Sequence, residues 1–137
     1  MATLHYEKVS DARDNFKALL DAASHGRPAT VRRDDQTAAV VDADRLRYFL
    51  AKICPNATVV SESGSWWVFI TGLPISADGS TLDEALDETV AALREYAEDW
   101  QDHLSTAPNH AGNWGLVQLV GLSTDAQLRT WLCGTPS

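Results

Sequence analysis

The stretch that decides the fold reads Leu4-His5-Tyr6-Glu7-Lys8-Val9-Ser10-Asp11-Ala12-Arg13-Asp14-Asn15-Phe16. Its lead-in, residues 4–9, favours a short strand. Ser10 can accept a hydrogen bond from a first-turn N–H, and Gly26 offers a left-handed stop. Between these two residues, apolar side chains recur at helical spacing, at Ala12, Phe16, Leu19, Leu20 and Ala23. The pattern predicts a strand followed by a helix that begins at Ser10.

A hairpin is predicted after this helix. Two β-favouring runs, 29–33 and 37–41, flank Asp34-Asp35-Gln36, whose side chains suit a turn. A strand–helix–hairpin unit of about forty residues buries too little apolar surface to be stable alone. We therefore expect the apolar helix face to meet a second copy, which would make the protein a homodimer or a higher even oligomer.

At these residues the sequence resembles the Phd/YefM family of antitoxins. The likeness rests on Val9-Ser10-Asp11-Ala12-Arg13, Phe16, Leu19-Leu20, Gly26-Arg27-Pro28, Val31-Arg32-Arg33 and Ala38-Ala39-Val40-Val41. It implies that residues 1–54 form a dimerisation and DNA-binding domain that recognises operator DNA through the first helix and nearby basic residues. It also implies a toxin partner held by whatever follows this domain.

The chemistry of the first helix agrees with that location. Helix N-termini and guanidinium groups both favour phosphate oxygens, and arginine can also read guanine. The expected DNA-binding residues are Ser10, Arg13, Asn15, Arg32 and Arg33. The alternative for Arg13 is an ion pair with an acid nearby, such as Asp14 or Glu7.

The bulk composition indicates a globular protein. Of the 137 residues, 45% are apolar and 22% are charged, and no apolar run approaches the length that crosses a membrane. The start lacks a charged region followed by an apolar core, so a cytoplasmic protein is expected. Cys54 and Cys133 lie far apart, and we interpret them as reduced thiols, Cys54 partly buried, in preference to a disulfide or a metal site.

The two halves of the chain differ in charge. Residues 1–52 hold nine Lys or Arg and eight Asp or Glu, whereas residues 53–137 hold two Lys or Arg and eleven Asp or Glu. Cations in the first half can be arranged to meet phosphates, and an acidic second half attracts a basic partner. The two halves are therefore suited to partners of opposite charge. The alternative is that the acidity serves solubility alone.

The junction between the halves is predicted at residues 53–57. Asp42 is placed to cap a short helix, and Pro55 disfavours helical geometry at Cys54. In that helix Leu46, Phe49, Leu50 and Ile53 share one face, whereas Arg45, Arg47 and Lys52 lie off it. A second domain would then span residues 57–137.

The second domain is predicted to begin with a hairpin and a long helix. Two β-rich runs, 57–62 and 66–71, flank Ser63-Gly64-Ser65, and Pro74 ends the second strand or places it at an edge. Residues 75–80 form a return segment or turn. Thr81 and Glu84 form a capping-box pair, and an apolar stripe follows at Leu82, Ala85, Leu86, Thr89, Val90, Leu93, Tyr96, Ala97, Trp100 and Leu104.

The other face of this helix is acidic. It carries Asp83, Glu84, Asp87, Glu88, Glu95, Glu98, Asp99 and Asp102. Such a row solvates a helix more often than it binds a metal, so we read it as a solvated face.

The predicted hairpin and long helix together resemble, over about fifty residues, the core of HicB-like antitoxin domains, which have a partial RNase H-like fold. The matching residues are Trp67-Val68-Phe69, Leu73-Pro74 and Gly79-Ser80-Thr81-Leu82-Asp83-Glu84-Ala85-Leu86. Typical HicB chains carry their DNA-binding module after this domain, whereas here the candidate precedes it. The comparison carries no catalysis, because the acids sit mainly on one helix and do not converge from several strands. The expected fold class is α+β, a small dimeric α+β module followed by a ββ-α domain.

The last third of the chain matches no motif known to us. Residues 105–113 read as a loop, 114–120 as a strand and 125–132 as a closing helix capped by Ser123 or Thr124. We expect this segment to complete the sheet of the second domain. The alternative is an exposed anchor for a partner.

The expected toxin-binding surface combines acids for steering with aromatics for lasting affinity. Its candidate residues are Trp66, Trp67, Asp83, Glu84, Asp87, Glu88, Glu95, Trp114 and Trp131. Phd/YefM antitoxins most often pair with RelE/YoeB-like or Doc-like toxins and HicB-like domains with HicA-like RNA cleavers, so the resemblances leave the toxin family open.

No enzyme is expected. The four histidines lack metal-ligand spacing, and no nucleophile-elbow, Walker-type or dinucleotide glycine pattern occurs, so no cofactor is implied.

The favoured function is an antitoxin of a type II toxin-antitoxin system that binds an RNA-cleaving, RelE/YoeB-like toxin and represses its own operon. The alternative is a stand-alone dimeric transcriptional repressor with an acidic sensor domain and no toxin. A toxin reading frame beside the gene would separate the two. A third alternative, an enzyme that uses the carboxylate helix, would require metal-dependent nuclease activity.

Overall fold

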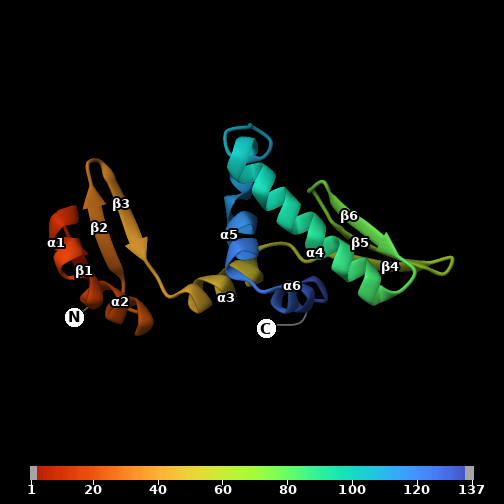
Figure 1. Cartoon of the computed structure of the whole chain (residues 1–137), viewed down its shortest axis with the longest axis horizontal. Helices are drawn as coiled ribbons and strands as arrows, with labels where there is room; N and C mark the ends of the chain where they lie inside the picture. The colour runs from red at the N-terminus through yellow and green to blue at the C-terminus, as the bar shows by residue number, and fades with distance from the viewer. Residues whose placement is uncertain (1–2, 135–137) are drawn as a thin grey trace. The chain divides into compact units, whose positions relative to one another are not determined.

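The computed structural model describes residues 3–134 and divides into two compact units, Met1–Leu46 and Arg47–Ser137 (Figure 1). Each unit contains one three-stranded sheet together with helices. The predicted α+β class is therefore confirmed. The division falls inside a helix, and the domain limits of 1–54 and 57–137 stay a prediction.

The sheet of the first unit has the order β1-β2-β3. β1 (Leu4–Tyr6) runs parallel to β2 (Ala29–Arg33), and β2 runs antiparallel to β3 (Gln36–Val40). The turn between β2 and β3 places Asp34 at φ 56°, a left-handed geometry that aspartate tolerates better than most residues. The hairpin was predicted correctly, although its second strand begins one residue earlier than expected.

The predicted single helix is two helices, α1 (Val9–Asp14) and α2 (Phe16–Ser24). Ser10 does not cap the first one, because the residue at the cap is Lys8 and Ser10 lies within the first turn. The break falls at Asn15, whose side-chain amide donates to the Asp11 carbonyl oxygen at 2.9 Å. An asparagine side chain that bonds a nearby backbone carbonyl in this way competes with helix continuation. The predicted stop is correct, with Gly26 at φ 76°.

The core of the first unit is small. Its buried cluster is Ala12, Leu19, Ala22 and Ala29. Leu4, Tyr6, Val31 and Val40 pack against this cluster from the sheet.

α3 (Ala43–Ile53) begins as predicted, because the Asp42 carboxylate accepts from the Arg45 N–H at 3.1 Å. Its predicted faces are only partly right. Leu50 is buried, whereas Phe49 and Ile53 are exposed, and Arg47, expected off the apolar face, is buried instead. The methylene stem of an arginine can be packed like an apolar side chain, so residue type alone assigned Arg47 to the wrong side.

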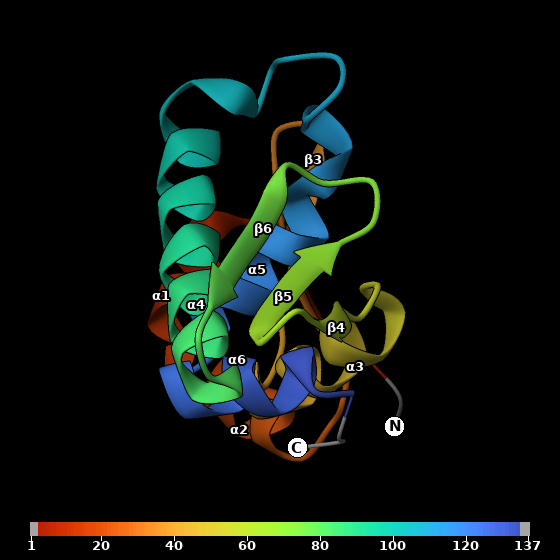
Figure 2. The same cartoon turned by 90° about the vertical axis from the view of Figure 1, so that its right-hand side faces the viewer.

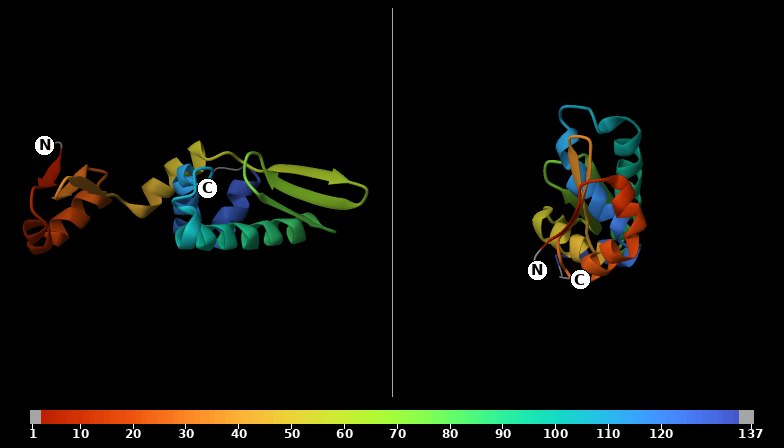
Figure 3. Two further views of the ribbon diagram at one scale, coloured as in Figure 1. Left: turned by 90° about the horizontal axis from the view of Figure 1, so that it is seen from above. Right: turned by 90° about the vertical axis from the view of Figure 1, so that its left-hand side faces the viewer.

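The sheet of the second unit is antiparallel, in the order β4-β5-β6. Its strands are β4 (Thr58–Glu62), β5 (Ser65–Ile70) and β6 (Ile75–Gly79), so the predicted return segment after Pro74 is a strand. One face of the sheet packs on α4 (Leu82–Asp99), which runs beside the strands in both Figure 2 and the left panel of Figure 3. Val68, Ile70 and Ile75 are buried there.

α4 is capped at its start and extended at its end. The Thr81 hydroxyl accepts from the Glu84 N–H at 3.1 Å, whereas the Glu84 carboxylate accepts from the Ser80 hydroxyl at 2.9 Å. Only half of the predicted capping box is therefore formed. The helix continues into a π-helical turn, Trp100–Leu104, and most of the predicted apolar stripe is buried.

The C-terminal third is helical, which corrects the predicted strand at 114–120. After a short 3₁₀ turn, Ala111–Asn113, come α5 (Trp114–Leu122) and α6 (Asp125–Leu132), and both pack on α4. The segment therefore completes the second unit by covering α4 and adds nothing to the sheet. α6 begins as predicted, with a capping box between Thr124 and Gln127.

Two arginines connect α4 to α5 and α6 through hydrogen bonds. The Arg94 guanidinium donates to the carbonyl oxygens of Val120 at 2.6 Å and Ser123 at 2.8 Å, and to Asp125 at 2.8 Å. It thereby adds a partner to the Val120 carbonyl, which also accepts the Ser123 N–H, and ties the end of α5 and the start of α6 to α4. Arg129 of α6 binds back to α4, as described below.

Candidate functional site

The basic candidates of the first unit lie on its surface. Ser10 and Arg13 are exposed on α1, and Arg32 and Arg33 are exposed at the end of β2. Among residues 3–134, Arg13 has no ion pair, so the alternative of pairing with Asp14 or Glu7 is not realised in this structure. Asn15 is also exposed, but its amide is engaged with the Asp11 carbonyl.

Glu7 engages one of these cations. Its carboxylate accepts a hydrogen bond from the His5 Nε2 at 3.0 Å and lies 3.8 Å from the Arg32 Nε. The hydrogen bond from His5, with smaller contributions from the charges of His5 and Arg32, holds the pKa of Glu7 below its usual value. Arg32 therefore already has an ion-pair partner within the unit, whereas Arg13 and Arg33 are free to contact a ligand.

Apolar side chains are also exposed on the first unit. The predicted apolar helix face is divided: Ala12, Leu19 and Ala23 lie inside, whereas Phe16 is 55% and Leu20 48% exposed. Phe16 and Leu20 are four residues apart and so share one face of α2. The same unit also has an apolar hollow of about 610 Å³, lined by Val9, Val31, Arg33, Gln36, Thr37 and Ala38.

The acidic face of α4 consists of two parts. On one side Arg129 of α6 binds two of the acids, donating to Asp83 at 2.8 Å and to Asp87. These carboxylates hold α6 in place. On the other side Glu84, Glu88 and Glu95 line a groove of about 620 Å³ together with Ser76, Asp78 and Ser80.

The outer face of the sheet borders this groove, and Trp67 is the one residue of this face that the sequence pattern singled out. Val60, Trp67 and Asp78 lie opposite one another across the three strands, and Thr58, Phe69 and Ser76 form the next row. All six are exposed, because the side chains that alternate with them along β5 face α4. The signal was present as an alternation in Trp66-Trp67-Val68-Phe69-Ile70. Both sets are apolar, however, so the pattern did not tell which set faces solvent.

The candidate tryptophans fall into three environments. Trp67 is 46% and Trp114 54% exposed, and Trp66 is half-buried opposite Gly79. Trp131 is only 4% exposed and belongs to the core of the second unit. Trp131 is therefore unsuited to anchor a toxin, because its side chain would have to leave that core to reach a partner.

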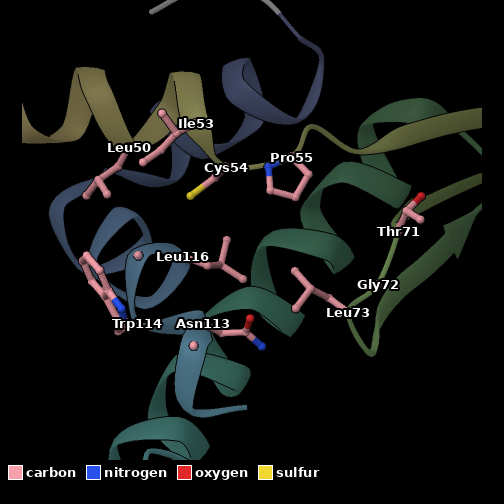
Figure 4. Close-up of a pocket in the computed structure, with 12 residues that line it drawn as sticks. Leu50, Ile53, Cys54, Pro55, Thr71, Gly72, Leu73, Asn113, Trp114 and Leu116 are labelled. Carbon is pink, nitrogen blue, oxygen red and sulfur yellow. The ribbon is translucent and has the colours of Figure 1, made fainter. Parts of the chain in front are cut away.

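An apolar pocket of about 360 Å³ lies in the second unit (Figure 4). Leu50, Ile53 and Cys54 line it from the end of α3, and Trp114 and Leu116 from α5. Burial raises the pKa of the Cys54 thiol, which agrees with its predicted partial burial. The thiol therefore stays protonated and poorly nucleophilic at neutral pH.

Residues 3–134 contain neither a cluster of metal-ligand side chains nor a helix suited to span a membrane. No three His, Cys, Asp or Glu side chains in this part of the chain gather closely enough to hold a metal ion. Likewise, no helix within the same range has the length and apolar character required to span a membrane.

Comparison with known proteins identifies the class. Residues 1–114 match a PHD-like family model described as antitoxin of toxin-antitoxin, RelE / RelB, TA system. The chain therefore belongs to this family of antitoxins.

A solved structure shares the fold. It is a crystal structure from Syntrophomonas wolfei subsp. wolfei, described as the antitoxin part of a proposed toxin/antitoxin system. It superposes with a TM-score of 0.75 at 21% sequence identity and covers 96% of each chain. No curated protein matches the chain significantly.

Proposed function

We propose that this antitoxin binds a basic, RNA-cleaving RelE-like toxin through its second unit and, as a dimer, represses its own operon through its first unit. One observation carries the proposal: the exposed cations lie mainly on the first unit, where acids accompany them, whereas the exposed charges of the second unit are nearly all acidic. Arg13 and Arg33 are accessible on the first unit, and Glu84, Glu88 and Glu95 line a groove on the second.

The repressor half rests on the surface of the first unit. Arg13 has no ion pair among the described residues, as noted above, and projects from the helix that the Phd/YefM likeness assigns to DNA. The exposed pair Phe16 and Leu20 supplies an apolar face for a second copy. Dimers of this kind place two copies of a recognition element on one operator, which raises affinity and sets the spacing of half-sites.

The toxin half rests on the chemistry of the second unit. RNA-cleaving toxins must hold a polyanion, so they present cationic surfaces that an acidic partner can cover. Between Lys52 and Arg94 the chain contains no Lys or Arg. The groove beside α4 and the exposed Trp67 and Trp114 offer this partner both charge and aromatic contact area.

The experiment is a paired binding assay on the full chain. The protein is co-expressed with the toxin encoded beside its gene and, separately, mixed with DNA from upstream of that gene. We expect a stable toxin complex and a retarded DNA band. DNA binding without any toxin complex would favour the stand-alone repressor, and a toxin complex without DNA binding would remove the repressor half.

A further inference from the structure

We propose that Trp67 and Asp78 form a recognition site for an arginine of the toxin, at the point where the outer face of the second sheet meets the acidic groove beside α4. The inference rests on the proposed toxin binding and specifies its chemistry. It concerns a basic segment of the toxin that crosses β6 into the groove.

The geometry comes from the strand register. Trp67 of β5 lies directly opposite Asp78 of β6, and both side chains are exposed on the face of the sheet turned away from α4. Side chains of directly opposed residues lie about 5 Å apart at Cβ, within reach of one ligand group. A guanidinium stacked on the Trp67 indole can therefore bind the Asp78 carboxylate in its own plane.

Arginine suits this pair better than lysine does. Its planar guanidinium stacks on an aromatic face and still presents parallel N–H donors to a carboxylate. Phe69 and Val60 flank the indole on the same face, so the stem of the arginine also meets apolar surface.

The groove continues the site with further negative charge. Asp78 lines it together with Ser76 and Ser80, and Glu84, Glu88 and Glu95 follow along α4. None of these acids has an ion pair within the described part of the chain, in contrast to Asp83 and Asp87, which Arg129 binds. A cationic side chain that pairs with these acids would therefore come from another molecule.

A second copy of this chain is a poor occupant of the same face. In a symmetric pairing of two such faces, the acids Asp78 and Glu62 would meet a surface that carries the same acids, and β4, β5 and β6 contain no Lys or Arg to offset them. Like charges facing each other oppose that association.

The test measures binding of the full-length protein to the toxin encoded beside its gene, by calorimetry at low and at raised salt. Trp67→Ala and Asp78→Asn should each weaken binding roughly tenfold. Asp78→Asn should also reduce the salt dependence of the affinity, whereas Trp67→Ala should leave it unchanged. Trp67→Phe should retain part of the affinity, because a smaller aromatic face remains.

Matched controls come from the same unit. Phe49→Ala removes an exposed aromatic from α3, and Glu98→Gln neutralises an exposed acid of α4 outside the groove. Both should bind the toxin as the wild type does. Circular dichroism and thermal unfolding verify that each variant is folded, which is expected because all the altered side chains are solvent-exposed.

The possible outcomes distinguish failure of the arginine site from failure of toxin binding itself. Wild-type affinity in both Trp67→Ala and Asp78→Asn overturns the arginine site and leaves toxin binding intact. Absence of toxin binding by the wild type removes both proposals. If Trp67→Ala changes self-association in sedimentation but not toxin affinity, the face belongs to a second copy and the inference is wrong.

Discussion

Arg13 is the single residue on which the DNA-binding proposal depends most. It is exposed on α1 and has no ion pair among the described residues. We expect Arg13→Ala to weaken operator binding by about 1–3 kcal/mol. Mobility-shift titration at moderate salt measures the change, and Arg27→Ala, which removes an exposed cation between α2 and β2, is the matched control. Equal affinity of the two variants would show that the contact lies elsewhere.

Gly79 is the residue whose lack of a side chain shapes the second unit. A Cβ at this position would lie 2.6 Å from the backbone nitrogen of Ala85, so the first turn of α4 sits where any other residue would collide. Gly79→Ala should lower the free energy of unfolding by about 1–3 kcal/mol, since backbone must move to admit the methyl group.

Gly121 provides the control for that measurement. It lies in α5, and apart from its chain neighbours and the adjacent helix backbone no atom comes within 4 Å of the position that a Cβ would take there, so alanine fits. Gly121→Ala should leave the free energy of unfolding unchanged or raise it by up to about 1 kcal/mol, because alanine favours a helix. Urea unfolding of both variants decides the point, and a Gly79→Ala protein as stable as the wild type would refute the close approach.

At the scale of elements, most of the helices and strands could be predicted from the spacing of apolar residues and from the turn and capping residues between them. The hairpin at Asp34, the β4–β5 hairpin and the capped starts of α4 and α6 are all signalled by local residue types. The failures have local causes too. Residues 114–120 form an almost continuous apolar run, and a short run of this kind does not distinguish a buried strand from a buried helix. Only packing against α4 decides it.

α2 carries the element-scale prediction. Phe16 and Leu20 are about half exposed and lie outside the buried cluster of the unit, so their replacement should spare the fold. If they form the dimer contact, Phe16→Glu with Leu20→Glu should weaken self-association by at least about tenfold, because apolar contact area is lost and like charges meet. Sedimentation velocity measures this.

Phe49→Glu is the control for this measurement, since it introduces the same charge on another exposed aromatic. A dimer that persists in the α2 variant, or one that the Phe49 variant dissociates, would place the interface elsewhere.

At the scale of the whole molecule, the sequence predicted the charge division but not how the acids are used. Counting shows that the second half is acidic, whereas only the fold reveals that Arg129 binds Asp83 and Asp87 while Glu84 and Glu88 stay open to a groove. Asp78 escaped notice for the same reason. It becomes a candidate only when strand register sets it beside Trp67.

The central claim is that the second unit binds the toxin, and growth rescue by fragments tests it most directly. The cut belongs at residues 42/43, because Arg47 and Leu50, which are buried, belong with the second unit. With the toxin encoded beside the gene expressed in the same cells, we predict full rescue by the whole chain and at least partial rescue by residues 43–137, provided circular dichroism shows the fragment folded. Residues 1–42 should not rescue. Rescue by 1–42 together with none by a folded 43–137 fragment would contradict the account.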